Sequence, residues 1–228
     1  SISVDGTAVT LKSCVKGAAR RYKMQGLPAA EYPTIPNYGT DGQFRITGDA
    51  GILADGLNRS AYASSNDETR PHLNSVLIEE LAGALSFVAT DGHRLAISRA
   101  MADDSATPSA KLTQLIIPLR AAREILKLCQ ECAANKHADR VVTLQTDGPN
   151  VFLNVNGFTF SSKLVDGSFP SYHQIIPDKT TYSAKLDRRA MIESLKAISV
   201  STGATGGVCL SFDANKVTIE ATSVNGDG

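Results

Sequence analysis

Hydrophobic and polar residues alternate one by one along several short segments of the chain. Val151, Leu153 and Val155 are separated by single residues, and Phe158 and Phe160 flank a threonine. Alternation with a period of two is typical of strands that turn one face toward a core. Strands are accordingly predicted at 44–47, 73–80, 85–90, 93–98, 114–117, 141–145, 151–155 and 158–164.

Other segments space their hydrophobic residues as on one face of a helix. They are residues 49–64, residues 120–133 and the segment that follows Asp187. Asp49 and Asp187 stand at the start of two of them, where a short acidic side chain favours helix initiation. Within 44–164 the elements follow the order βαβββ twice. This order predicts an α+β fold, with two helices on one face of antiparallel sheets.

The pattern of the middle of the chain recurs before and after it. Ile2–Pro36 resembles Leu144–Pro177 in its strands and turns, and Phe44–Ser64 resembles Tyr182–Thr202, each a short strand followed by a helix. Both comparisons give an offset of about 140 residues, which is the size of an ordinary domain. We therefore expect tandem units: the end of one at 1–40, a complete one at 41–178 and the beginning of a third at 179–228.

Composition narrows the classes of function. The 228 residues contain 23 Lys plus Arg and 23 Asp plus Glu, so the formal net charge is zero. A tight nucleic-acid binder usually has a basic excess, so any positive field here must be local. The apolar runs are too short to span a bilayer, and no charged start followed by an apolar core predicts a signal peptide. The four cysteines are expected to be reduced thiols of a cytoplasmic protein with no membrane partner. A start at Ser1 suggests a fragment.

Cations gather on the polar face of the second and third helices. Those selected as candidate DNA contacts are Arg120, Arg123, Lys127, Arg189 and Lys196. Cations on the outward face of sheet-packed helices suit sequence-independent contact with phosphate oxygens. The same pattern is also typical of an ordinary solvated helix face. Arg59, the only cation of the first helix, favours the solvated interpretation.

A second candidate chemistry is a thiol or zinc site at Cys129-x-x-Cys132 with His137. Zinc normally requires four ligands, and Cys129 falls on the apolar face of its helix, so core thiols are the alternative. No nucleophile elbow or phosphate-binding loop occurs in the sequence. We therefore expect neither catalytic residues nor a metal or other cofactor. Glu79 and Glu80 are interpreted as surface charge at a strand end.

Two motifs resemble a known family. The first is Thr-Asp-Gly-His-Arg-Leu-Ala at 90–96, whose Asp-Gly pair predicts a hairpin turn. The second is Ser-Lys-Leu-Val-Asp-Gly at 162–167, followed by Phe169-Pro170 and Tyr172. Together they resemble the bacterial DNA sliding clamp, the beta subunit of the replicative DNA polymerase III holoenzyme. That family has three similar domains per chain, and two chains form a ring whose helices line the pore.

The resemblance implies a non-catalytic processivity factor that holds duplex DNA without sequence preference in the bacterial cytoplasm, at the nucleoid. It also implies short linear motifs of DNA polymerase, clamp loader and repair proteins as partners. Carried over by motif, the wall of the partner-peptide groove contains Leu73, Thr90, Gly92, His93, Arg94, Leu95, Pro170 and Ile175. A homodimeric ring is expected at full length, whereas this chain alone is expected neither to close a ring nor to bind peptide at full strength.

The sequence departs from the family at three places near these sites. The loop at 66–68 is acidic, so no DNA contact is carried over to it. His72 stands where an aromatic residue is common, and His173-Gln174 where arginine is frequent. A thiol- or zinc-dependent enzyme that uses Cys129, Cys132 and His137 remains the alternative function.

Overall fold

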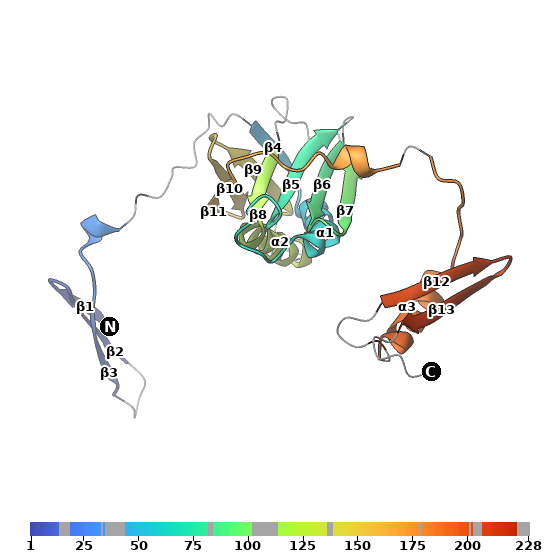
Figure 1. Cartoon of the computed structure of the whole chain (residues 1–228). Helices are drawn as coiled ribbons and strands as arrows, with labels where there is room; N and C mark the ends of the chain where they lie inside the picture. Colours follow the sequence, from blue (N-terminus) through green and yellow to red (C-terminus); the bar gives the residue numbers. More distant parts are fainter. Residues whose placement is uncertain are drawn as a thin grey trace. The chain divides into compact units, whose positions relative to one another are not determined.

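The structure, a computed structural model, describes residues 1–13, 19–32, 34, 44–81, 84–101, 114–135, 139–177, 179–200, 202 and 207–222. The chain divides into two compact units, Ser1–Tyr172 and His173–Gly228. Figure 1 labels their helices and strands. In the described residues no helix has the length and apolar character needed to cross a membrane.

The first sheet of the middle region is antiparallel, with the order β11-β10-β9-β4. Its strands are β4 (Phe44–Asp49), β9 (Val141–Thr146), β10 (Asn150–Val155) and β11 (Phe158–Lys163). Asn156 and Gly157 form a two-residue turn between β10 and β11, and both have positive φ, at 49° and 78°. An Asn-Gly pair suits this turn because the backbone twist of a tight hairpin requires positive φ at both positions.

The second sheet is also antiparallel and has the order β7-β6-β5-β8. Its strands are β5 (Ser75–Leu81), β6 (Ala84–Thr90), β7 (Leu95–Met101) and β8 (Leu115–Pro118). The predicted turn at Asp91-Gly92 forms, with Gly92 at a φ of 92°. Thr90 pairs with Leu95, so β7 begins two residues later than predicted. The reason is local, because the amides of His93 and Arg94 donate to the Asp91 carboxylate. These amides are therefore not available for hydrogen bonds between β6 and β7.

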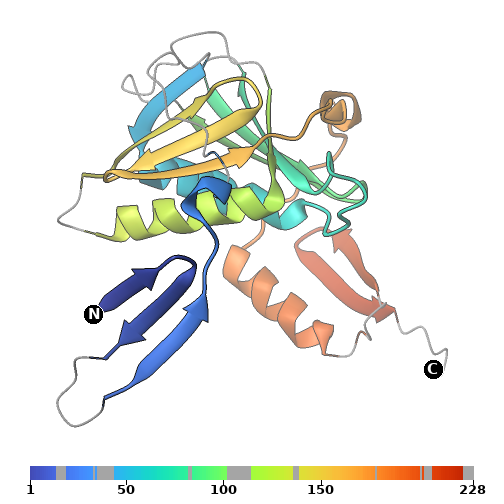
Figure 2. The same cartoon turned by 90° about the vertical axis from the view of Figure 1, so that its left-hand side faces the viewer.

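Two helices, α1 (Ala50–Ser60, continued by the short η2, Ala61–Ala63) and α2 (Leu119–Ala134), cover the same face of both sheets. Figure 2 shows both helices on one side of the strands. As predicted, Asp49 starts α1, because its Oδ1 accepts a hydrogen bond from Gly51 N at 2.6 Å. The predicted α+β class, with two βαβββ units and both helices on one face, is confirmed.

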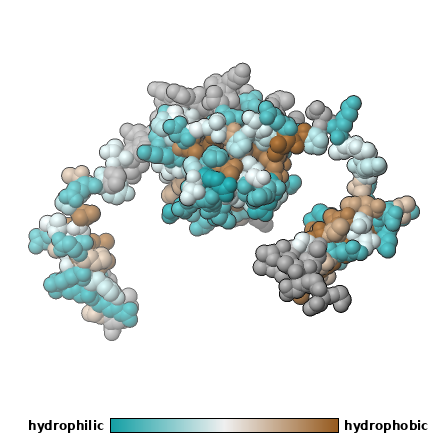
Figure 3. Space-filling model, viewed as in Figure 1, coloured by the Kyte–Doolittle hydropathy of each residue, from teal (hydrophilic) through white to brown (hydrophobic). Residues whose placement is uncertain are grey.

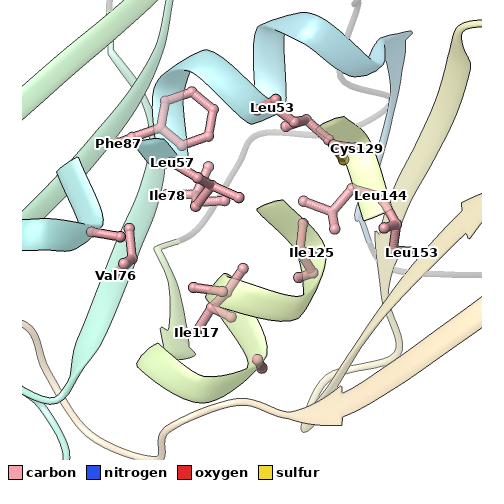
Figure 4. Packing of buried hydrophobic residues seen from close by; sticks show 14 of the residues in the cluster. Leu53, Leu57, Val76, Ile78, Phe87, Ile117, Ile125, Cys129, Leu144 and Leu153 are labelled. Carbon is pink, nitrogen blue, oxygen red and sulfur yellow. The ribbon is translucent and has the colours of Figure 1, made fainter. Parts of the chain in front are cut away.

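The core lies between these helices and the sheets. Leu57 of α1, Phe87 of β6, Ile125 of α2 and Leu144 of β9 are all buried and meet there (Figure 4). The helix and the sheet approach most closely at Gly56, where an added β-carbon would lie only 2.4 Å from the ring of Phe87. A glycine is therefore needed at this point of α1, although glycine disfavours a helix interior.

The N-terminal segment forms a separate small sheet of order β1-β2-β3. Its strands are β1 (Ile2–Asp5), β2 (Ala8–Lys12) and β3 (Arg21–Gln25), and the short helix η1 (Ala29–Glu31) follows. The predicted Asp-Gly turn joins the first two strands, with Gly6 at a φ of 58°. Most of its side chains are exposed.

The C-terminal unit contains α3 (Arg188–Ser199) and the antiparallel hairpin of β12 (Gly207–Asp213) and β13 (Lys216–Thr222). The predicted cap is present, because Ala190 N donates to Asp187 Oδ1 at 2.8 Å. The predicted short strand at Tyr182 is wrong: residues 182–187 have no strand structure. Its counterpart β4 pairs only with β9, about 95 residues later.

Candidate nucleic-acid interface and partner groove

The candidate DNA contacts of α2 share one exposed face. Arg120, Arg123 and Lys127 are exposed, while Ile125 and Cys129 on the opposite side are buried against the sheets. The structure thus brings the three predicted cations together, as the helical spacing required. Arg189 and Lys196 are also exposed, on α3 in the other compact unit.

Acidic side chains reduce the positive field near α2. Glu124 and Glu131 are exposed on the same helix. On α1 the Nε of Arg59 lies 2.8 Å from Asp55 Oδ1, so that cation is paired within its own helix. Exposed cations and carboxylates therefore alternate along α2, and its positive field is weak.

The acidic loop before β5 lies next to these cations. Arg123 Nη2 donates to Asn66 Oδ1 at 3.5 Å. In the same loop Arg70 Nε lies 2.8 Å from Asp67 Oδ2. The side chain and the amide of Thr69 both donate hydrogen bonds to Asp67, and so does the side chain of Arg70. These hydrogen bonds hold the pKa of Asp67 below its ordinary value. The Asp67 charge is thus compensated within the loop.

The β6–β7 loop carries most of the candidate groove residues. Gly92, His93 and Arg94 are exposed, Leu95 is half-buried and Thr90 is buried. Thr90 Oγ1 donates to Arg94 O at 2.7 Å and accepts from Gly92 N at 3.1 Å. Leu73, by contrast, is buried in the turn just before β5, with 8% of its surface exposed.

Two side-chain interactions that the sequence did not predict order this loop. The Asp91 carboxylate accepts from the amides of His93 and Arg94, which lowers its pKa, and its Oδ2 lies 3.0 Å from Arg94 Nε. The guanidinium of Arg94 also lies over the ring of Tyr62, 5.8 Å from the centroid, an arrangement that favours a cation. Asp91 stood in the recognised motif, but nothing in the sequence linked Tyr62 to Arg94.

The connector, which we define as residues 164–172, packs on the face of the second sheet that points away from the helices. Phe169 and Tyr172 are buried there in a cluster with Leu77, Val88 and Ile116. Leu95, Ile97 and Val165 pack against the same cluster. The predicted groove residue Leu95 thus packs against this cluster, and Pro170 directly follows its member Phe169. In Figure 3 hydrophobic surface is visible on this side of the middle region.

The last predicted groove residue, Ile175, is not placed relative to the others. It belongs to the short helix η3 (Tyr172–Ile175) and is 67% exposed. The boundary between the compact units falls at Tyr172, so Ile175 lies in the C-terminal unit. Pro170, which precedes the boundary, is exposed on the connector.

Glu79 corrects a sequence prediction, because it is not surface charge. Its side chain is buried on the same face as Leu77, 8% exposed, and the hydroxyl of Tyr172 donates to its Oε1. Gln114 Nε2 donates to the other carboxylate oxygen at 3.2 Å. The signal was present in the period of two along β5, which places Glu79 and Leu77 on one face.

The thiols of α2 are placed as core residues. Cys129 and Cys132 are buried, and burial, with a smaller effect of Cys132, raises the pKa of Cys129 to about 12. Cys132 Sγ donates to Asp139 O at 3.4 Å. Burial and a raised pKa disfavour the thiolate form of Cys129, which is the form that acts as a nucleophile. His137 lies outside the described residues, and the described ones contain no group of three potential metal ligands.

Comparison with known proteins decides the family. The family model described as DNA polymerase III beta subunit, central domain, matches residues 49–171, more than half of the chain. The chain belongs to the DNA polymerase III beta subunit family. The matched region, from Asp49 to Ser171, comprises both helices and every strand of the middle region except β4.

Curated relatives of the beta subunit family are bacterial beta sliding clamps. That of Vibrio cholerae is 30% identical over 167 residues, 73% of this chain and 42% of the relative. That of Synechococcus elongatus is 29% identical over 180 residues, 79% of this chain and 46% of the relative. The chain thus spans about half the length of the curated relatives it matches.

Solved beta subunit structures have the same fold. The beta sliding clamp of Caulobacter crescentus superposes with a TM-score of 0.78 and 25% identity, over 98% of this chain and 57% of that one. The DNA polymerase III subunit beta from Pseudomonas aeruginosa gives a TM-score of 0.75 at 24% identity, over 97% of this chain and 60% of that one. The alternative of a thiol- or zinc-dependent enzyme has no support in these comparisons.

Proposed function

We propose that the chain is part of a ring-shaped sliding clamp that encircles duplex DNA and tethers the replicative polymerase and other partners. The match of residues 49–171 to the central domain of the DNA polymerase III beta subunit carries this proposal. On this basis residues 1–40 end a first domain, 41–178 form the second and 179–228 begin the third. The chain acts as a non-catalytic subunit, in the bacterial cytoplasm at the nucleoid.

The balanced charge supports holding DNA by encirclement. A ring that retains DNA by its topology needs only weak, sequence-independent contacts with phosphates. Arg120, Arg123 and Lys127 are exposed on the side of α2 opposite the core, and we assign them to the pore. Arg189 and Lys196 of α3 are assigned the same role in the third domain. Two complete chains form the ring.

The partner site is proposed at the surface that joins the β6–β7 loop to the connector. Leu95 and Pro170 supply its apolar part, and Thr90, Gly92, His93 and Arg94 its polar edge. Leu73 and Ile175 are the remaining residues that the motif match assigns to this wall. A partner peptide with leucine and phenylalanine anchors obtains most of its affinity from a few such buried contacts.

DNA retention tests the ring. We extend the polypeptide to the full length of its relatives, load it with its clamp loader on nicked circular plasmid and isolate the complex. We expect retention on the circle and rapid loss after linearisation, because a ring slides off free ends. Equal retention on circular and linear DNA, or none on either, contradicts the proposal.

Charge reversal tests the pore assignment. Each phosphate contact contributes about 0.9 to the slope of log affinity against log salt. The triple change Arg120→Glu, Arg123→Glu and Lys127→Glu should therefore lower that slope by about 2–3. The matched control is Arg45→Glu, because Arg45 is exposed on β4, next to Ile46, whose side chain packs on the helices. If the control lowers the slope equally, the DNA-facing helices are misassigned.

Peptide titration tests the groove in the same full-length polypeptide. The probe is a short peptide with adjacent leucine and phenylalanine residues. We expect Leu95→Ala and Pro170→Ala each to weaken its binding about tenfold or more. Undiminished affinity in both variants shows that the groove lies elsewhere.

A further inference from the structure

The outer face of the second sheet carries a polar row beneath the connector. Glu79 of β5 is paired in register with Ser86 of β6, and Ser86 with Arg99 of β7. Gln114, just before β8, donates to one oxygen of Glu79, and the hydroxyl of Tyr172 donates to the other. The row therefore crosses the sheet, and the connector covers it at Glu79.

A buried carboxylate is costly unless hydrogen-bond donors replace the water it has lost. Glu79 is 8% exposed and Tyr172 only 3%. The two donors to Glu79 are Gln114, which lies just before β8, and Tyr172, which belongs to the connector. When Tyr172 docks, it therefore donates a hydrogen bond to the buried Glu79 carboxylate and also fixes the connector on the sheet.

The connector is attached at both ends and exposed in between. At its start Leu164 N donates to Pro149 O at 2.8 Å and Val165 N to Ile116 O at 2.9 Å. Residues 166–168 are exposed. At its far end the rings of Phe169 and Tyr172 meet edge to face, with centroids 6.5 Å apart and planes at 79°. The far end is thus held by buried side chains rather than by a strand ladder.

This attachment controls the position of Pro170. Pro170 is exposed between two buried residues, Phe169 and Tyr172, and their docking restricts its position. Leu95 packs against the same cluster from β7. The distance between Leu95 and Pro170, the two apolar residues of the proposed groove, therefore depends on the seating of Tyr172.

We propose that Tyr172 and Glu79 form a latch that seats the connector and thereby pre-shapes the groove for partner peptides. Both are positioning residues: their side chains act through Pro170 rather than on the peptide. The inference rests on the proposed function of the groove. Pre-shaping matters because ordering a flexible site during binding costs free energy, and this cost lowers the affinity for the peptide.

The latch itself is tested in the 228-residue chain by amide hydrogen exchange. Tyr172→Phe keeps the ring and removes the donor, whereas Glu79→Gln keeps an oxygen that can accept. Tyr182→Phe and Glu80→Gln are the matched controls, since Tyr182 is 91% exposed and Glu80 is the next residue of β5. We expect at least about tenfold faster exchange at the amides of Phe169 and Tyr172 in Tyr172→Phe.

Two features separate a latch from general destabilisation. Amides of β9 and β10 should keep their exchange rates in Tyr172→Phe, and Glu79→Gln should show a smaller effect because its amide oxygen still accepts. The double variant should exchange no faster at the connector than Tyr172→Phe alone. Unchanged exchange at the connector, or an equal increase throughout the chain, overturns the latch.

Peptide binding then tests its consequence in the full-length polypeptide, with the same leucine–phenylalanine probe. We expect Tyr172→Phe to weaken binding several-fold, Glu79→Gln less, and both controls not at all. If Leu95→Ala weakens binding and Tyr172→Phe does not, the groove stands and the latch is refuted. If Leu95→Ala has no effect either, the proposed groove itself fails, and the exchange data alone decide whether the connector is latched.

Discussion

Helix α1 of the middle region and helix α3 of the C-terminal unit start alike, each with an aspartate that accepts a hydrogen bond from a nearby amide. An antiparallel hairpin follows each helix, β5–β6 or β12–β13. Their interiors differ. Leu57 of α1 is completely buried, whereas no residue of α3 is buried.

The difference lies in what covers the helix. In the middle region α2, β9 and β10 close the core over α1 and its hairpin. In the described part of the C-terminal unit α3 packs on β13, and an open hollow remains between α3, the hairpin and residues 182–187. Local sequence is thus sufficient to form a capped helix and a hairpin, while a core requires both βαβββ halves of a unit.

Excision gives the largest expected effect. Residues 44–172 alone should unfold in one cooperative transition, with a free energy of unfolding in the range of about 5–15 kcal/mol. Residues 179–228 alone should show none, because they bury too little apolar surface to offset chain entropy. Thermal unfolding followed by circular dichroism measures both. A cooperative transition in the short fragment would show that its own contacts suffice.

Matched leucines sharpen the comparison. Leu195 of α3 occupies the position that Leu57 occupies in α1, eight residues after the capping aspartate. Leu57→Ala should cost about 2–5 kcal/mol through the cavity that it leaves. Leu195→Ala should cost below about 1 kcal/mol, since its side chain is only half-buried. Chemical denaturation measures the shift of the cooperative transition of the whole chain in each variant, and equal shifts would contradict the comparison.

The position just before each of these leucines tests close packing. Gly56 contacts the Phe87 ring, whereas the equivalent Ser194 lines the hollow beside Ile219. Gly56→Ser should cost about 1–3 kcal/mol, because the ring must move to admit a β-carbon. Ser194→Gly should cost about 0.5 kcal/mol from helix propensity alone. A neutral Gly56→Ser, measured by denaturation, would mean that the ring yields freely.

Thiol chemistry gives the smallest effect. Cys209 of β12 is exposed, so a disulfide reagent should modify it at the rate of a free thiol, and Cys129 and Cys132 only as the core opens. Mass spectrometry assigns each site.

Burial raises the pKa of Cys129 from 9.0 to about 12, so the folded chain retains a proton that the unfolded chain releases. Its contribution to stability is complete below pH 9.0 and decreases as the pH rises toward 12.

Cys129→Ala provides the control for this pH dependence. Burial raises the pKa of Tyr172 as well, so part of the loss of stability at high pH should persist in the variant. The difference in stability between the two chains should be constant below pH 9.0 and decrease as the pH rises above it. A difference that stays the same from neutral pH to 12 contradicts the assignment to Cys129.

The sequence predicted what depends on near neighbours. The spacing of Ile125 and Cys129 placed the cations of α2 on the opposite face, and the Asp49 and Asp187 caps formed as expected. What it did not predict depends on distant partners. Glu79 is buried because Tyr172 reaches it from 93 residues away. Tyr182 forms no strand, because a sheet edge requires a neighbour as well as a suitable pattern.

The pairing of β4 with β9 has a consequence for how the protein is made. Thr47 and Thr143 are hydrogen-bonded through their hydroxyls although 96 residues separate them. A ribosome that adds roughly 5–20 residues per second needs about 5–20 s to travel that distance. Throughout this interval the nascent chain carries an unpaired strand edge. Slow translation between residues 50 and 140 should therefore favour aggregation or chaperone capture of the emerging chain.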